Sequence, residues 1–497
     1  MREMEADKIT VNTPNEAYES MAVKWRLIDN LMGGTLAMRE AGREYLPQYA
    51  KESDARYRLR LQNSVLLEKF KDTVQTLSAR PFGSPVALNE DADPFFWEIA
   101  ENVDLTGRNM TVFARECMSD LLSYGKCHFM AEYPNTVELR EMMGRDLTLA
   151  DERQLKLRPY LVRISPSAII NWEGRRIGGV EQLTRLQVRH TIPIQHPQNE
   201  FAVEMKHLVV VWTRQRIVVW ERISDEGEDE VWMPVDNGDL PNTLGEIPLV
   251  TVYANRKKLL TAEPPLEGLA HLNAKHWRNQ SDQDNIEQVA RVPMLFFRGF
   301  SKQDVASVEV GPFKVFGNQD PQSDVMVIET NGNAVKVGSD ALREVERQMN
   351  VMSMSPMERR AGNPTATELA IEAGREVSDL EAYVMLLEYG LKQGLGFCAK
   401  WANRDAQILP DVLISEDLGY SVTSGRELEE LREDFKLGVL DKRTYLEERK
   451  RRGLYHESVE VNDVLASLET ENPFTELDID EDIDEDIEDD EDEAEAA

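Results

Sequence analysis

A long amphipathic helix is the strongest structural signal in this chain of 497 residues. Between positions 369 and 395, apolar side chains recur every three or four residues, which is the period of an α-helix buried along one face. The series is Leu369, Ala373, Val377, Leu380, Val384, Leu387, Leu391 and Leu395. We expect one helix from Ala366 to about Asn403, roughly 55 Å long at ~1.5 Å per residue.

Capping residues mark the start of this helix. Thr365 and Glu368 fit a T-x-x-E capping box, in which the two side chains satisfy backbone N–H groups of the first turn. Asn363 as the cap, with Pro364 at the first helical position, is the alternative. In either case the sequence specifies a fixed entry point.

Four methionines precede this entry point: Met349, Met352, Met354 and Met357. Methionine is unbranched and adapts to irregular surroundings. We therefore expect a flexible loop between the long helix and the helix before it.

The first half of the chain is expected to hold three helices and then a sheet. Apolar spacing predicts helices at 17–31, 55–79 and 106–123. From about 126 to 253, β-branched and aromatic runs alternate with turn residues, which is typical of short strands in an antiparallel meander. The "RQR" sequence at 214–216 predicts a tight turn between two of them.

Helix returns after Pro264 and Pro265, but its middle, "RNQSDQDN", is strongly polar. Such a helix either lies between partners or contacts water on most sides. Short strands are expected within 293–300, 313–318 and 324–330, followed by a helix over 339–352.

The C-terminal region is expected to form helices at 427–437, 442–452 and 459–468, followed by an acidic tail. The segment 476–497 contains 15 acidic residues and no Lys or Arg, so it is too charged to fold alone.

The whole chain has 91 acidic and 57 basic residues, which gives a formal net charge of −34. This balance argues against a protein that grips phosphates through a broad basic surface; nucleic acid should slide past it or be excluded.

Motifs of catalysis and metal binding are missing from the sequence. It has no P-loop, no H-E-x-x-H and no G-x-S-x-G. His271 and His276 are five positions apart, which does not place them on one helix face, and the carboxylates within 281–284 fit a solvated helix face. We therefore expect no enzyme and no cofactor.

The cysteine pattern and the lack of long apolar runs indicate the compartment in which the protein resides. Cys117, Cys127 and Cys398 form no C-x-x-C pair, which fits free thiols in a reducing compartment. No signal peptide and no membrane-spanning run is expected, because neither the N-terminus nor any other segment has the required apolar stretch.

The order of these elements resembles a tailed-bacteriophage portal protein. The resemblance is carried by "PSAIINW" at 166–172, by the helix "PLEGLAHLNAKHWRNQSD" at 265–282, by "GNPTATELA" at 362–370 and by "GVLDKRTYLEERKRRGLYHE" at 438–457.

The resemblance implies an α+β portal fold with a defined domain order. The domains are a wing of helices and β-meander at 1–262, stem helices at 263–290 and 338–349 around a small α+β clip at 291–337, a tunnel loop at 350–363, the long wing helix at 364–423, a helical crown at 424–472 and a disordered acidic tail at 473–497.

The resemblance also implies a function. Portal proteins form a ring, usually a dodecamer, around a channel for double-stranded DNA at one capsid vertex. The implied partners are the terminase large subunit, head–tail adaptor or connector proteins, the major capsid protein and a scaffolding protein, with no membrane. The protein would be made in the host cytoplasm and reside in the virion.

The tunnel loop would line the narrowest part of the channel, with Met352, Met354, Met357, Glu358, Arg359 and Arg360 as its candidate residues. Arginines crowded by ring symmetry need either an acidic neighbour, such as Glu358 or a wing carboxylate, or a DNA phosphate.

Two other hypotheses stay open. The chain could be another virion connector or structural protein, or a soluble enzyme with an unrecognised site. Electron microscopy of the purified protein separates them, because a ring, a different assembly and a compact monomer look different.

Overall fold

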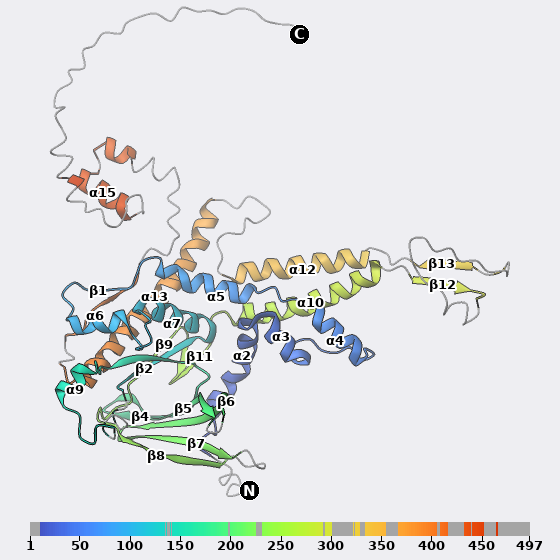
Figure 1. Cartoon of the computed structure of the whole chain (residues 1–497). Helices are drawn as coiled ribbons and strands as arrows, with labels where there is room; N and C mark the ends of the chain where they lie inside the picture. Colours follow the sequence, from blue (N-terminus) through green and yellow to red (C-terminus); the bar gives the residue numbers. More distant parts are fainter. Residues whose placement is uncertain are drawn as a thin grey trace, which may run out of the picture. The chain divides into compact units, whose positions relative to one another are not determined.

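The computed structural model describes residues 10–134, 136, 140, 142–196, 199–224, 231–291, 294–300, 322, 324–328, 333–353, 366–404, 408–415, 432–438, 440–451 and 464–465. The chain divides into two compact units, Met1–Tyr420 and Ser421–Ala497. The first unit combines helices with antiparallel sheets, which confirms the predicted α+β class (Figure 1).

Six helices precede the first long strand in the described part of the chain. They are α2 (Glu16–Met32), α3 (Gly34–Ala41), α4 (Asp54–Asn63), α5 (Lys69–Ala79), α6 (Pro94–Glu101) and α7 (Met110–Tyr124). α2 and α7 confirm two of the predicted helices. α7 begins a few residues later than expected, because the Asn109 side chain caps it by accepting the Val112 N–H at 3.0 Å. It ends at Gly125, whose φ of 77° is the left-handed conformation that glycine adopts readily.

The single helix expected over 55–79 is wrong, because the chain breaks between α4 and α5. Ser64 is extended, with ψ at 131°. The Leu66 N–H is satisfied by the Thr35 hydroxyl at 3.2 Å instead of by a helical carbonyl. Leu59 in α4 and Val65 in the break are both exposed.

Two antiparallel sheets follow, as predicted. The smaller has the strand order β3 (Tyr160–Ile164), β2 (Lys126–Glu132), β9 (Leu249–Tyr253). The larger is a five-stranded meander of β4 (Ile169–Ile177), β5 (Val180–His196), β6 (Asn199–Thr213), β7 (Arg216–Ser224) and β8 (Val231–Pro241). The predicted turn between β6 and β7 is confirmed, whereas β5 and β6 are longer than the short strands expected.

The remaining short elements of the first unit connect these layers. β1 (Ala87–Leu88) pairs with β14 (Val412–Leu413), β10 (Arg256–Lys258) pairs with β11 (Thr261–Ala262), and α9 (Leu149–Gln154) precedes β3.

The predicted long helix is confirmed as α13 (Ala366–Trp401), which packs on the three-stranded sheet. Leu387, Leu391 and Leu395 are fully buried in the main hydrophobic core. Two glycines allow a close approach. A Cβ at Gly390 would lie 2.4 Å from Val252 of β9, and one at Gly394 would lie 2.9 Å from Phe129 of β2.

Adding a methyl group at either glycine should therefore destabilise the protein. We expect Gly390→Ala and Gly394→Ala to lower the free energy of unfolding by about 1–3 kcal/mol, as overpacked cores do. Gly396→Ala is the matched control in the same helix, because its nearest neighbour is the end of the flexible Leu409 side chain. Urea unfolding followed by circular dichroism measures all three, and equal stability of the Gly390→Ala variant and wild type would contradict the tight contact.

A buried lysine joins the two sheets to α2. The Lys126 ammonium donates to the Leu260 carbonyl at 2.6 Å and lies 4.9 Å from the Trp25 ring and 5.6 Å from the Trp172 ring. Both rings offer a favourable cation–π contact. Burial nevertheless lowers the pKa of Lys126 to about 7.

This lowered pKa predicts a specific dependence of stability on pH. Between pH 7 and the ordinary lysine pKa of 10.5, the unfolded chain binds a proton that the folded chain releases, so raising the pH favours folding. Relative to Lys126→Met, wild type should gain up to about 1.4 kcal/mol per pH unit above pH 7. Parallel urea titrations from pH 6 to 10 test this, and a difference that stays constant with pH would contradict it.

Two long helices bracket a pair of strands. α10 (Glu267–Arg291) and α12 (Asn333–Met352) pack side by side, and β12 (Met294–Arg298) pairs antiparallel with β13 (Asp324–Ile328) between them in sequence (Figure 1). α12 begins five residues earlier than the stem helix expected at 338–349 and ends three residues later. The strand expected at 313–318 lies outside the described residues.

The second unit contains α15 (Lys442–Arg451), which confirms the helix expected at 442–452. Residues 432–436 and 464–465 are also helical, within the helices expected at 427–437 and 459–468. The Phe435 and Tyr445 rings stack with their centroids 4.4 Å apart. The acidic tail at 473–497 lies outside the described residues.

Candidate functional site

The polar helix α10 is buried along much of its length. Asn273, His276, Ser281 and Gln283 are each at most 4% exposed. α10 contacts α2, α4 and α5 as well as α12. Of the two alternatives left by the sequence, the structure selects the first: α10 is polar because it lies between partners whose polar groups it satisfies.

The solvated helix face expected over 281–284 is therefore wrong in part. Ser281 and Gln283 point into the structure, whereas Asp284 is exposed and accepts from the Gln280 amide at 2.7 Å. The sequence could not distinguish these positions, because all four residues are polar.

Polar contacts join α10 to α12. His276 Nε2 lies 3.2 Å from Glu346 Oε1. The Gln283 amide donates to the Glu287 carboxylate and to the Val335 carbonyl, both at 3.0 Å. A Cβ at Gly338 would lie 1.9 Å from Gln283 Oε1, so the backbone of α12 rests directly against this amide.

The two histidines considered for a metal site do not converge. His271 is exposed and lies 3.8 Å from Glu267, whereas His276 faces Glu346. Among the residues that the structure describes, no group of three or more His, Cys, Asp or Glu side chains could hold a metal ion.

Asn273 holds the extended segment between α4 and α5. Its Oδ1 accepts the Phe70 N–H at 2.9 Å, and its Nδ2 donates to the Leu67 carbonyl at 2.8 Å. The Asn273 side chain is fully buried, so both backbone groups depend on it.

Asn273→Ala should leave one buried donor and one buried acceptor without partners. We expect a loss of about 2–4 kcal/mol in the free energy of unfolding, since each orphaned group costs about 1–3 kcal/mol. Asn279→Ala is the control in the same helix, because the Asn279 side chain makes no hydrogen bond within the described part of the chain. Thermal unfolding of both variants gives the comparison, and similar melting temperatures would show that Asn273 is dispensable.

Arg60 anchors α4 beside α10. It donates to both oxygens of Glu52 at 2.8 Å and to the Pro47 carbonyl at 2.8 Å, and it lies 4.3 Å from the Tyr49 ring. The Arg60 hydrogen bond lowers the pKa of Glu52. Burial, followed by a hydrogen bond to Asp282 of α10, raises the pKa of Tyr49 to about 12.

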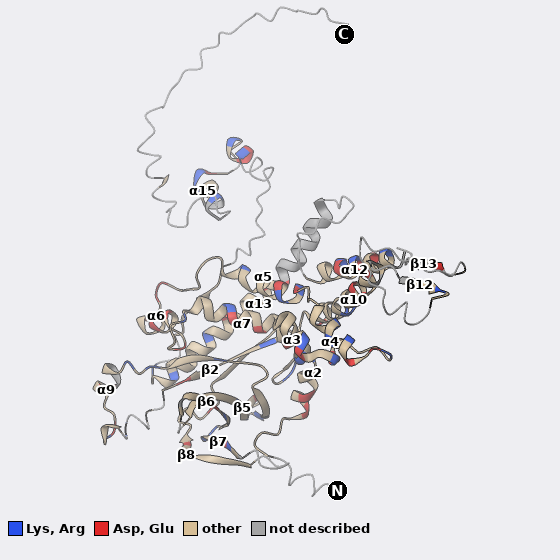
Figure 2. Cartoon of the chain, turned by 45° about the vertical axis from the view of Figure 1, so that its right-hand side comes forward, with Lys and Arg blue, Asp and Glu red and all other residues tan. Residues whose placement is uncertain are grey.

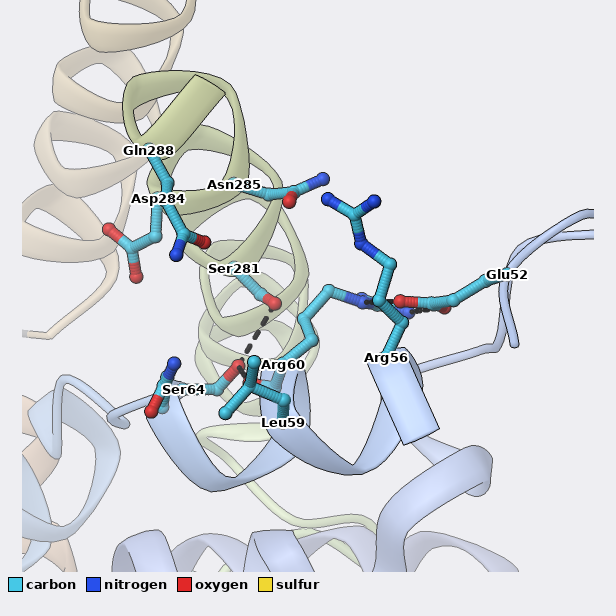
Figure 3. Close-up of a pocket in the computed structure, with 10 residues that line it drawn as sticks. Glu52, Arg56, Leu59, Arg60, Ser64, Ser281, Asp284, Asn285 and Gln288 are labelled. Atoms are coloured by element: carbon cyan, nitrogen blue, oxygen red, sulfur yellow. Dashed lines mark hydrogen bonds and ion pairs between the residues drawn. The ribbon is translucent and has the colours of Figure 1, made fainter. Parts of the chain in front are cut away.

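A groove of about 350 Å³ opens between α4 and the second half of α10 (Figure 3). Its lining residues are Glu52, Arg56, Leu59, Arg60, Asn63, Ser64, Ser281, Asp284, Asn285 and Gln288. The hydrogen bond between the Ser64 and Ser281 hydroxyls, 2.9 Å long, closes its floor. Its walls combine one apolar side chain with amides and charges of both signs, which suits the side chains of a protein partner.

The residues predicted as a site are not assembled by the described structure. Met352 is the last residue of α12 and 49% exposed, with its sulfur 3.2 Å from the position of a Cβ at Gly268. Glu368 is the third residue of α13. Met354, Met357, Glu358, Arg359, Arg360 and Thr365 lie outside the described residues, as does the Glu368 side chain.

The groove could not be predicted from the sequence. Its only signal was the polar stretch of α10, which indicated burial between partners without indicating the position of the groove.

No helix within the described ranges is both long and apolar enough to cross a membrane.

Comparison with known families and structures adds three findings. Residues 265–402 match the model of a family described as a domain of unknown function (DUF4055). This range runs from just before α10 to just after α13. No curated protein matches the chain.

Solved structures similar to the chain include the neck of an empty GTA particle at 11% identity, the virion of a native gene transfer agent (GTA) particle at 10% and the neck of a native GTA particle at 10%. Each match covers 77% of this chain and 88% of the other, with a TM-score of 0.39. A TM-score of 0.39 does not establish a common fold.

Proposed function

We propose that this chain is a portal protein: one subunit of a ring at a capsid vertex, through which double-stranded DNA enters and leaves. The observation that carries the proposal is the order of the elements after the sheets. α10 leads to the strand pair β12 and β13, α12 returns along α10, and the long helix α13 then passes through the main core.

This order is the stem, clip, stem and wing of the portal resemblance. α10 and α12 take the stem positions, the β12–β13 pair belongs to the clip, and α13 is the wing helix. The tunnel loop expected at 350–363 begins later, because residues 350–352 belong to α12. Residues 354–363 keep the tunnel-loop position between α12 and α13. Under this proposal Met354, Met357, Glu358, Arg359 and Arg360 line the channel.

The partners follow from the same proposal. The terminase large subunit docks during packaging, connector proteins dock afterwards, and the capsid and scaffolding proteins surround the ring. The chain does no catalysis, because in this scheme the ATPase is a separate protein. The formal net charge of −34 supports a channel that does not trap DNA, since carboxylates repel phosphates.

Acidic and basic residues both occur along α10 and α12 (Figure 2). Mixed charge at these helices suits contact with neighbouring subunits and water, since large exposed surfaces of one sign would repel identical copies in a symmetric ring.

Electron microscopy of the purified full-length chain tests the proposal. We expect class averages of closed rings of about twelve subunits with a central hole wide enough for a DNA duplex, the closed symmetry typical of homo-oligomers. A compact monomer would contradict it. Assembly only in the presence of another ring would instead indicate a head–tail connector that binds a separate portal.

A further inference from the structure

Helix α10 separates two different surfaces. His276 and Gln283 point toward α12, whereas Ser281, Asn285 and Gln288 line the groove. Because an α-helix has 3.6 residues per turn, the residues that face α12 and the residues that line the groove lie on roughly opposite sides of α10. The α12 helix of the same copy therefore cannot reach the groove, which stays open at its mouth (Figure 3).

The outward face of α12 has no neighbour among the described elements. Val337 is 70% exposed and Val351 is 54% exposed, one near each end of the helix. Between them lie two surface ion pairs, Asp340 with Arg343 at 3.4 Å and Glu344 with Arg347 at 2.8 Å. Exposed pairs of this kind contribute little within one chain, so their charges remain available to a partner.

The groove offers complementary groups. Arg56 on the α4 wall donates no side-chain hydrogen bond within the described part of the chain, and Asp284 on the α10 wall is exposed. Leu59, 52% exposed, adds an apolar surface beside them. One cation, one carboxylate and an apolar wall match a helix face that carries carboxylates and guanidinium groups between two valines.

We propose that this groove receives the outward face of α12 from a second copy of the chain. The proposal rests on the proposed function and deepens it, because it names the surfaces through which neighbouring subunits meet. Since the two surfaces differ and lie on opposite sides of one helix pair, the contact is head-to-tail. Such a contact repeats from copy to copy and closes into a ring when the rotation allows, whereas a two-fold contact would stop at a dimer.

Site-directed crosslinking of the full-length protein tests the contact. Cys117, Cys127 and Cys398 are all buried, so a maleimide should react selectively with cysteines introduced on the surface. Asn63→Cys at the groove is combined, in separate variants, with Val337→Cys, Glu344→Cys or Val351→Cys on α12. Each protein is treated with a short bismaleimide and run on a denaturing gel.

A head-to-tail contact predicts a distinctive result. At least one double variant should form a covalent ladder beyond the dimer, because each copy carries both halves of the contact. An equimolar mixture of the matching single variants should stop at the dimer. Asn63→Cys combined with Arg115→Cys, an exposed residue of α7, is the control and should give no ladder.

Filling the groove provides a second measurement. Asn285→Trp should reduce the ladder by about tenfold or more, equivalent to a loss of about 1.4 kcal/mol in contact free energy. Gln62→Trp, on α4 but outside the groove, should leave it unchanged.

The outcomes separate this inference from the proposed function. Intact rings with no ladder from any of the three pairs, or a ladder equally strong in the Arg115 control, would overturn the groove contact and leave the portal proposal standing. A ladder without closed rings would support the contact and contradict the portal. If neither a ladder nor closed rings are observed, both the groove contact and the portal proposal are overturned.

Discussion

The contact between α13 and the three-stranded sheet is the constraint on which the rest of the first unit depends. Gly390 and Gly394 let the helix backbone lie directly on side chains from β9 and β2, at separations that a single methyl group would violate. The same core cluster includes Leu266 just before α10, Leu269 in its first turn and Met349 near the end of α12. The helix pair is therefore rooted in the core that α13 organises, and its position follows from that packing.

Polar groups, rather than apolar ones, define how α10 meets its neighbours. Asn273, Gln283 and Ser281 each bond to a different element, and all are buried. A buried polar group is costly unless its partner is correctly placed, so such contacts tolerate few alternative arrangements. Because these hydrogen bonds join α10 to several different parts of the chain, they restrict both its rotation and its register.

Hydrophobic periodicity predicted the helices and strands that bury apolar side chains of their own along one face. α13, α2, α7 and the meander could be recognised because their own side chains carry the pattern. The break between α4 and α5 could not, because the groups that satisfy its backbone, Thr35 and Asn273, are distant in sequence. The groove was missed for the same reason: it forms only where α4 meets α10, and its lining is polar. The expected channel residues from Met354 to Arg360 lie outside the described ranges, so their placement stays a prediction.

Gly338 has a mechanical consequence. Because the α12 backbone rests against the Gln283 amide only where a side chain is missing, sliding α12 by about one turn would bring the side chain of Ala341 or Leu342, on the same face of the helix, toward that space. This contact therefore opposes sliding of one helix past the other. A helix pair held in register in this way favours transmission of a push at β12 and β13 toward the core over slippage between α10 and α12.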